Sequence, residues 1–138
     1  MIPCTATKLK RGVYNKRMDP ASDPKKLSPV LLLRIGLGLV FIYAGAHQIA
    51  NPGGWAGFVP AWLGDIIAPL TFIYIHGAIE LALGLGIIIG FYLPALAIIA
   101  SLDLFAILIF FGVDDVTFRD FGLLMASLAL FFFTRKEK

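Results

Sequence analysis

The sequence predicts an all-α membrane protein: a four-helix transmembrane bundle of up-and-down topology, with a short interfacial helix between spans 1 and 2. Of its 138 residues 59% are hydrophobic, and a mean hydropathy of +0.85 leaves too little polar surface for a soluble domain of this size. Four apolar stretches are long enough to cross a hydrocarbon core about 30 Å thick. They run roughly from Pro29 to Ala50, Ile66 to Gly90, Leu93 to Gly112 and Phe118 to Thr134.

Basic residues lie mainly outside these stretches and predict the topology. Seven of the twelve Lys and Arg residues fall within residues 1–28 and three within residues 135–138. Because such residues concentrate in cytoplasmic segments, we expect a basic cytoplasmic extension (1–28), a membrane domain (29–134) and a basic cytoplasmic tail (135–138), in the cell or cytoplasmic membrane. The net charge of +3 reflects this topology, so the expected partner is a lipid bilayer and not nucleic acid. Cys4 is the only cysteine, which excludes dithiol chemistry within the chain.

The first span begins with a helix-start signal, and aromatic residues follow its end. Ser28 supplies a cap and Pro29 suits the first turn. Trp55, Phe58 and Trp62 are spaced by three and four residues, which predicts one aromatic stripe on a short helix in the outer interface. This helix is by default a membrane anchor; the functional alternative is a lid over a pocket between the spans.

Two acids within apolar runs are the strongest functional signal. The second and third spans are joined by a few residues near Tyr92, which predicts a tight hairpin, and Glu80 and Asp103 are mirrored about that turn. At about 1.5 Å of rise per residue, each lies roughly 15 to 17 Å from the turn, near the middle of the bilayer. An ionisable group at this depth is costly and therefore a functional candidate. We take Glu80, Asp103 and Arg34 as candidate catalytic residues.

Polar residues of the first two spans predict the surroundings of these acids. Arg34 lies about five residues inside the membrane boundary, so it either snorkels outward or reaches inward to Glu80. His76 is one helical turn from Glu80 and shares its face. Because two carboxylates outweigh one guanidinium in an apolar medium, at least one of the two acids is expected to carry a proton. The candidate cofactor-binding residues are Tyr43, His47, Gln48 and His76.

A purely structural role for the same residues stays open. The intramembrane polar residues can be a polar clasp that fixes the register of the helices, with His76 as a hydrogen-bonded packing residue. Two histidines without a recognisable ligand spacing predict no metal site. Arg119 and Asp120, at the outer start of the fourth span, either close the outer mouth near His47 by ion pairing or merely flank the interface.

Three runs of the chain carry a family resemblance. LLRIGLGLVFIYAGAHQI in the first span, IELALGLGIIIGFYLPALAIIA in the second and FRDFGLLMASLALFF in the last resemble the DoxX family of small membrane proteins, which includes the membrane subunit of thiosulfate:quinone oxidoreductase. The likeness rests on an early Arg, an aromatic-x-x-Ala-Gly motif, a Glu before a Gly-rich run and an Arg-Asp pair. These are Arg34, Phe41 with Ala44 and Gly45, Glu80, and Arg119 with Asp120. The chain departs from the family at Gln48, near which relatives commonly carry a Lys.

The resemblance implies a four-helix membrane bundle and redox work with quinone and sulfur compounds. A membrane subunit of a quinone-linked oxidoreductase would bind a quinone head group between the spans. Since no electron-carrying motif is visible, its electrons would come from a partner oxidoreductase subunit or a small reductant. The alternatives are a non-catalytic bundle that binds lipid or a partner membrane protein, and a proton or small-solute pathway, which would require a homo-oligomer for room.

Overall fold

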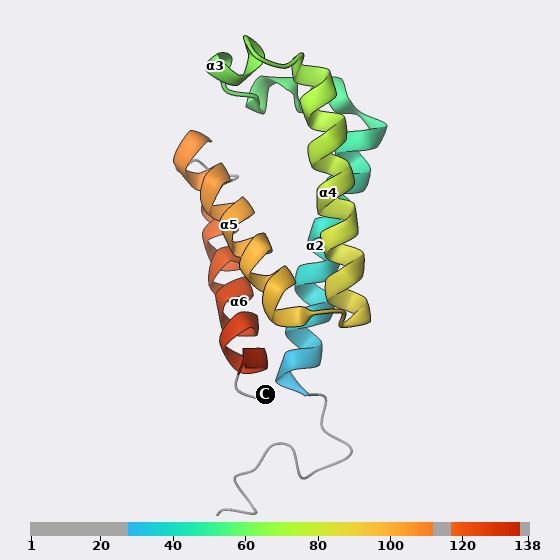
Figure 1. Ribbon diagram of the computed structural model, residues 1–138, viewed down its shortest axis with the longest axis vertical. Coiled ribbons are helices and arrows are strands. Elements are labelled where there is room, and N and C mark those ends of the chain that lie inside the picture. The colour runs from blue at the N-terminus through green and yellow to red at the C-terminus, as the bar shows by residue number, and fades with distance from the viewer. Residues whose placement is uncertain (1–27, 112–116, 136–138) are drawn as a thin grey trace, which may run out of the picture.

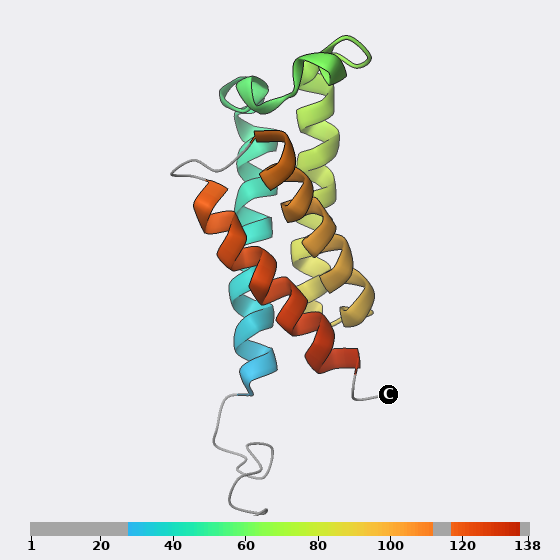
Figure 2. The same cartoon turned by 90° about the vertical axis from the view of Figure 1, so that its left-hand side faces the viewer.

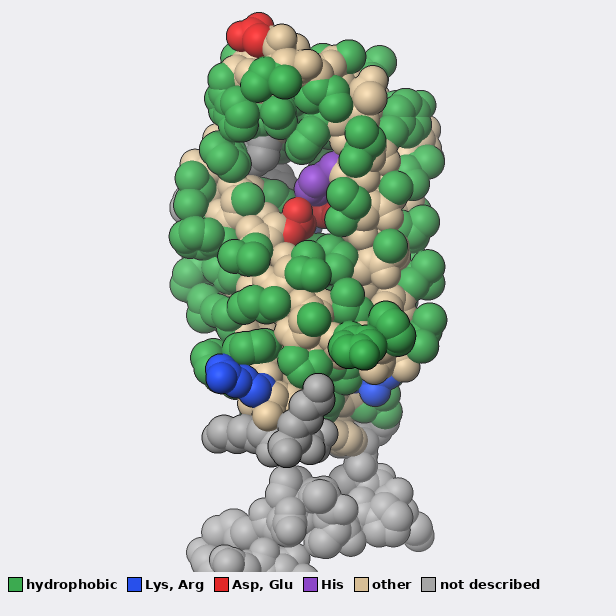
Figure 3. All heavy atoms as spheres, in the orientation of Figure 1, with side chains coloured by type: hydrophobic (Ala, Val, Ile, Leu, Met, Phe, Trp, Pro, Cys, Tyr) green, Lys and Arg blue, Asp and Glu red, His purple; other side chains and the backbone are tan. Residues whose placement is uncertain are grey.

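The computed structural model describes residues 28–111 and 117–135, and every regular element in them is helical. Four long helices are present: α2 (Pro29–Ala50), α4 (Pro69–Ile89), α5 (Leu93–Phe111) and α6 (Thr117–Arg135). Each is long and apolar enough to cross a membrane, and large apolar side chains cover the outer surface (Figure 3). The predicted four-span integral membrane protein is therefore confirmed. The basic extension up to residue 27, with Cys4, and residues 136–138 lie outside the described residues, and the cytoplasmic termini stay a prediction.

The four helices form two pairs. α2 packs along α4, and α5 packs along α6. α4 and α5 are joined by a short turn but diverge from it (Figure 1), and the α5/α6 pair is inclined to the α2/α4 pair (Figure 2). This corrects the expectation of a tight hairpin between the second and third spans: the turn is short, but each of the two helices packs mainly on another partner.

Glycines allow the close packing of α2 on α4. A Cβ atom added to Gly84 would lie 2.6 Å from the carbonyl oxygen of Gly38, and one added to Gly45 would overlap the carbonyl of Gly77. Since lipid gives helices no hydrophobic reason to associate, such small residues are what allows close van der Waals contact. The pairing therefore brings the backbones of α2 and α4 together along most of their length.

The α5/α6 pair is joined by serines. The hydroxyl oxygens of Ser101 and Ser127 lie 2.7 Å apart, and both side chains are buried. Apolar residues of all four helices complete the core around them, among them Phe41, Ile87, Ala100 and Leu130.

The helix boundaries follow proline and glycine. α4 begins at Pro69, three residues later than the apolar run predicted, because Pro fits the first turn and the residue before it avoids helical angles; Ala68 is accordingly extended, with ψ 129°. Gly90 ends α4 in the left-handed conformation, with φ 88°, and Tyr92 also has a positive φ of 41°. These two residues reverse the chain between α4 and α5.

The connection between α2 and α4 contains three short helical segments: the 3-10 helices η2 (Pro52–Gly54) and η3 (Ala56–Phe58), and the four-residue α-helix α3 (Ala61–Gly64). A short helix is thus present, but the segment is interrupted where Gly and Pro occur, so the predicted aromatic stripe does not lie on one helix. Trp55 contacts Phe58, with ring centroids 5.7 Å apart, whereas Trp62 contacts Phe110 near the end of α5 at 5.6 Å. We call this end of the bundle the loop side, and the opposite end, where α2 begins and α6 ends (Figure 1), the terminal side.

Candidate functional site

A cavity of about 1030 Å³ lies between the two helix pairs, toward the loop side. Its wall is mostly apolar, and Trp55, Phe58 and Trp62 belong to it. Figure 3 shows an opening between α4 and α5 below the loop-side segment, with acidic and histidine side chains visible inside. Because this opening is on the flank of the bundle, it faces the lipid. The aromatic segment thus covers a cavity, as its lid interpretation requires.

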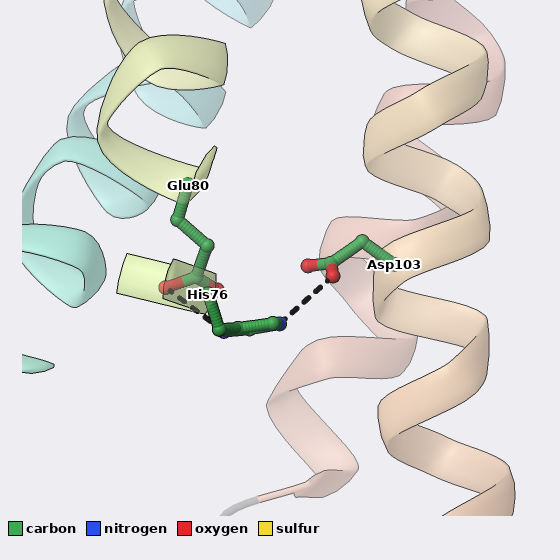
Figure 4. A group of neighbouring side chains, drawn as sticks. All are labelled: His76, Glu80 and Asp103. Carbon is green, nitrogen blue, oxygen red and sulfur yellow. Dashed lines mark hydrogen bonds and ion pairs between the residues drawn. The ribbon is translucent and has the colours of Figure 1, made fainter. Parts of the chain in front are cut away.

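Glu80, His76, Gln48 and Asp103 form a hydrogen-bonded chain at the inner end of the cavity. Gln48 Nε2 donates to Glu80 Oε2 at 2.5 Å, and Gln48 Oε1 lies 3.0 Å from His76 Nδ1. His76 Nε2 lies 3.0 Å from Asp103 Oδ1 (Figure 4). The two acids that the sequence placed at one depth are therefore brought together, and His76 bridges the helix pairs between them. We call these four residues the polar cluster.

The hydrogen bond with Gln48 places a hydrogen on Nδ1 of His76. The Oε1 atom of Gln48 can only accept, so Nδ1 of His76 carries the hydrogen of that bond. The Nε2 atom then faces Asp103 either as a second N–H or with its lone pair. Gln48 thereby orients the imidazole and leaves Nε2 as the nitrogen that is available for chemistry.

The acids differ in their surroundings. The Glu80 side chain is only 6% exposed, whereas those of His76 and Asp103 are 21% and 18% exposed. Asp103 Oδ2 is buried and has no hydrogen-bond partner within residues 28–111 and 117–135, which is unusual because buried polar atoms are nearly always satisfied. Asp103 therefore retains an acceptor position that its described neighbours do not use.

Glycine explains why Gln48 reaches both His76 and Glu80. Gly77 lies directly beside His76 on α4, and a Cβ atom there would lie 2.9 Å from Cβ of Gln48. The absence of that side chain lets α2 approach until the Gln48 amide fits between the two α4 side chains. The same close approach buries Gln48, which is 3% exposed.

Tyr43 and His47 are cavity residues of α2 outside the polar cluster. Their rings are stacked with centroids 5.9 Å apart. His47 Nδ1 accepts a hydrogen bond from Trp55 Nε1 at 2.9 Å, which ties the loop-side segment to α2. Arg119 and Asp120 also line the cavity, as the mouth-closing interpretation of this pair requires.

Arg34 does not reach inward to Glu80 but points toward the terminal-side end of α4. Its Nε and Nη2 atoms donate to the carbonyl oxygens of Ile87 and Ile88, at 3.1 and 2.6 Å. Ile87 is seven residues from Glu80, about 10 Å along the helix. The guanidinium therefore binds the C-terminal end of α4, away from Glu80. The structure thus separates Arg34 from the two acids with which the sequence analysis grouped it, because unpaired carbonyls at a helix end are strong acceptors for a cation.

One wall residue was missed by the sequence analysis. Phe72 stacks on His76, with ring centroids 5.6 Å apart and an interplanar angle of 27°. Its position four residues before His76 was the available signal, because such residues share a helix face.

The polar cluster also holds a possible donor set for a metal ion. One donor atom each from His76, Glu80 and Asp103 can be chosen so that all lie within 4.8 Å of one another. The expectation of no metal rested on spacing along the chain, which does not reveal that Asp103 of α5 lies beside two α4 residues.

Comparison with known proteins gives one family. The model of the DoxX family matches residues 30–113, more than half of the chain. All four members of the polar cluster lie within this match, whereas Arg119 and Asp120 lie beyond it. The chain has no match among curated proteins or among solved structures.

Proposed function

The chain belongs to the DoxX family, and from this premise we propose that it is the membrane subunit of a quinone-linked oxidoreductase whose cavity binds a quinone head group. The observation that carries the proposal is the apolar cavity of about 1030 Å³ with buried proton-holding groups at its inner end. A quinone is a lipid-soluble ring with two polar oxygens, so its binding site needs an apolar slot, polar contacts and access from the membrane.

The opening of the cavity supports a ligand that arrives through lipid. It lies between α4 and α5 on the flank of the bundle, among exposed apolar side chains (Figure 3). A ligand with a long apolar tail would keep that tail in the bilayer while the head group enters the cavity.

The polar cluster supports proton chemistry at the head group. Reduction of a quinone to its quinol takes up two electrons and two protons. Glu80, Asp103 and His76 are groups that hold or release protons beside the cavity, and Gln48 keeps the His76 ring in place. The electrons come from a partner subunit or a small reductant, because the chain shows no electron-carrier motif.

Two competing functions receive less support. A purely structural clasp would be packed dry around Glu80, whereas the cavity extends to this residue. A transmembrane proton pathway needs polar groups along the membrane normal, whereas the polar cluster runs sideways from α2 and α4 to α5.

Quinone binding tests the proposal, and the chain provides its own reporter. Both tryptophans of the sequence, Trp55 and Trp62, line the cavity, so decylubiquinone should quench their fluorescence saturably in purified protein. Replacing Glu80→Gln should weaken binding about tenfold, since it changes a buried hydrogen-bonding charge. The exposed acid Asp65 gives the matched control Asp65→Asn, which should bind like wild type.

A second pair of variants separates the cavity from general partitioning into detergent. Ala106 lines the cavity, whereas Ala95 is exposed on the same helix. Ala106→Phe should abolish saturable quenching and Ala95→Phe should retain it. Linear, unsaturable quenching that is equal in all variants would refute the quinone site.

A further inference from the structure

We propose that His76, Glu80 and Asp103 bind one divalent first-row transition-metal ion of the Zn²⁺ class. This site goes beyond the quinone proposal and does not depend on it, because it rests on the donor atoms themselves. One imidazole nitrogen and two carboxylates form a donor set that such ions accept.

The distances between the donor atoms suit one shared ion. Metal–nitrogen and metal–oxygen bonds of about 2.0 to 2.2 Å place two ligands of one ion roughly 3 to 4 Å apart. His76 Nε2 and Asp103 Oδ1 are 3.0 Å apart, and Glu80 Oε2 lies 4.0 Å from His76 Nδ1. One donor atom from each residue can be chosen so that all three lie within 4.8 Å of one another. The widest separation therefore has to close by less than about 1 Å, which rotation of the Glu80 side chain can supply.

Gln48 prepares His76 as a ligand. Metal-bound histidines almost always donate their second ring N–H to a fixed acceptor, which sets the tautomer and the ring orientation. Gln48 Oε1 accepts this hydrogen from Nδ1, so Nε2 is directed toward Asp103 (Figure 4). A metal ion would take the place of the hydrogen that Nε2 and Asp103 share when the site is empty. The second amide atom of Gln48 holds Glu80, so one residue orients two of the three proposed ligands.

The charge around the cavity favours a cation. Three carboxylates line it, those of Glu80, Asp103 and Asp120, against one guanidinium, that of Arg119. With all three carboxylates ionised and His76 neutral, the formal excess is two negative charges, the charge of one divalent ion, so binding of the ion would release any proton that the cluster holds. The buried Asp103 Oδ2 atom, which has no hydrogen-bond partner among the described residues, provides a further oxygen for the ion.

The three ligands would leave a coordination position open. Structural zinc sites use four protein ligands, whereas sites with three protein ligands keep a position for water or substrate. Since His76, Glu80 and Asp103 all line the cavity, a molecule within it can occupy that position.

The test measures metal and not activity. Untagged full-length protein carrying Cys4→Ser, which removes the only thiol, is stripped with a chelator, reloaded with Zn²⁺ and washed, and its metal content is determined by mass spectrometry. We expect one equivalent of Zn²⁺ per chain. Glu80→Gln and Asp103→Asn should each lower the affinity at least about tenfold. Matched controls are the exposed acid Asp65→Asn and the second histidine His47→Gln, both of which should retain the ion.

Two outcomes would overturn the site: no Zn²⁺ on folded wild-type protein, or equal Zn²⁺ on wild type, Glu80→Gln and Asp103→Asn. If the ligand variants fail to fold, X-ray absorption of the zinc-loaded wild type decides the question. One imidazole with carboxylate oxygens in the coordination shell supports the site, and a shell without imidazole refutes it.

Discussion

The imidazole of His76 on α4 and the carboxylate of Asp103 on α5 meet at 3.0 Å between the two helix pairs. The chain connects α4 and α5 by a short turn on the terminal side, yet this contact forms near the middle of both helices, where they have already diverged (Figure 1). The contact therefore spans the inner end of the cavity and joins the wall made by α2 and α4 to the wall made by α5 and α6.

Removing Arg34 should destabilise the bundle without affecting the cavity. Arg34→Met deletes two hydrogen bonds to the carbonyls of Ile87 and Ile88, and bonds of a charged donor contribute about 1–3 kcal/mol. We expect a loss of that order in reversible unfolding by SDS, followed by circular dichroism. Arg34→Lys should recover only part of the loss, because an ammonium lacks the planar fork that reaches both carbonyls. Decylubiquinone affinity should not change, and a large fall in it would contradict the separation of Arg34 from the site.

Glycine-to-alanine changes should distinguish packed from open faces of α2. Gly45 lies against the α4 backbone, whereas a Cβ atom at Gly36 would meet nothing within 4 Å. Gly45→Ala should therefore lower the free energy of unfolding by about 1–3 kcal/mol, the usual cost of overpacking, while Gly36→Ala should stay within about 0.5 kcal/mol of wild type. Equal effects of the two substitutions would show that the glycines do not set the α2/α4 interface.

The serine contact between α5 and α6 should give a measurable but small coupling. The Ser101 and Ser127 hydroxyls can form a hydrogen bond with each other, and each can also donate to a backbone carbonyl, that of Ala97 or Leu124. Because the two hydroxyls have only two hydrogens for these three hydrogen bonds, the bond between the serines is formed only part of the time. A double-mutant cycle with both Ser→Ala changes should yield about 0.6 kcal/mol, typical of side-chain bonds between membrane helices. The matched cycle of Ser101 with Thr134, whose hydroxyl bonds within α6, should be additive. A coupling of zero for the serine pair would contradict the contact.

Removing the indole ring of Trp62 should expose the loop side of the cavity to solvent. The Trp62 ring packs on Phe110 across the helix pairs, and both line the cavity together with Trp55. Trp62→Ala and Trp62→Phe each leave Trp55 as the only tryptophan. Acrylamide should quench Trp55 more strongly in the alanine variant than in the phenylalanine variant, which retains an aromatic ring. Identical quenching constants would mean that this ring does not cover the cavity.

Features that depend on local composition were predictable from the sequence. The four spans follow from apolar length, and the mid-membrane positions of Glu80 and Asp103 follow from counting residues from the turn at Tyr92. The approach of the two acids to within 4.8 Å goes beyond that prediction, because equal depth on two helices does not by itself bring their side chains together.

Features that depend on which surfaces meet were not predictable. The close approach at Gly77 was not predicted, and nothing in a single sequence says that its partner is Gly45 of α2 and not a residue of α5. The position of Gln48 between His76 and Glu80 depends on that choice. The hydrogen bonds of Arg34 could not be read from the sequence, because a long side chain has several acceptors in reach, and the carbonyls at the end of α4 were not considered among them.

The two helix pairs are held together by more than the turn at Gly90 and Tyr92, from which α4 and α5 diverge (Figure 1). α2 also packs on α6, and one buried core contains residues of all four helices. An occupant wider than the cavity would have to break these contacts and the one between His76 and Asp103. The packing between the pairs therefore sets an upper limit on the size of the molecule that the protein can admit.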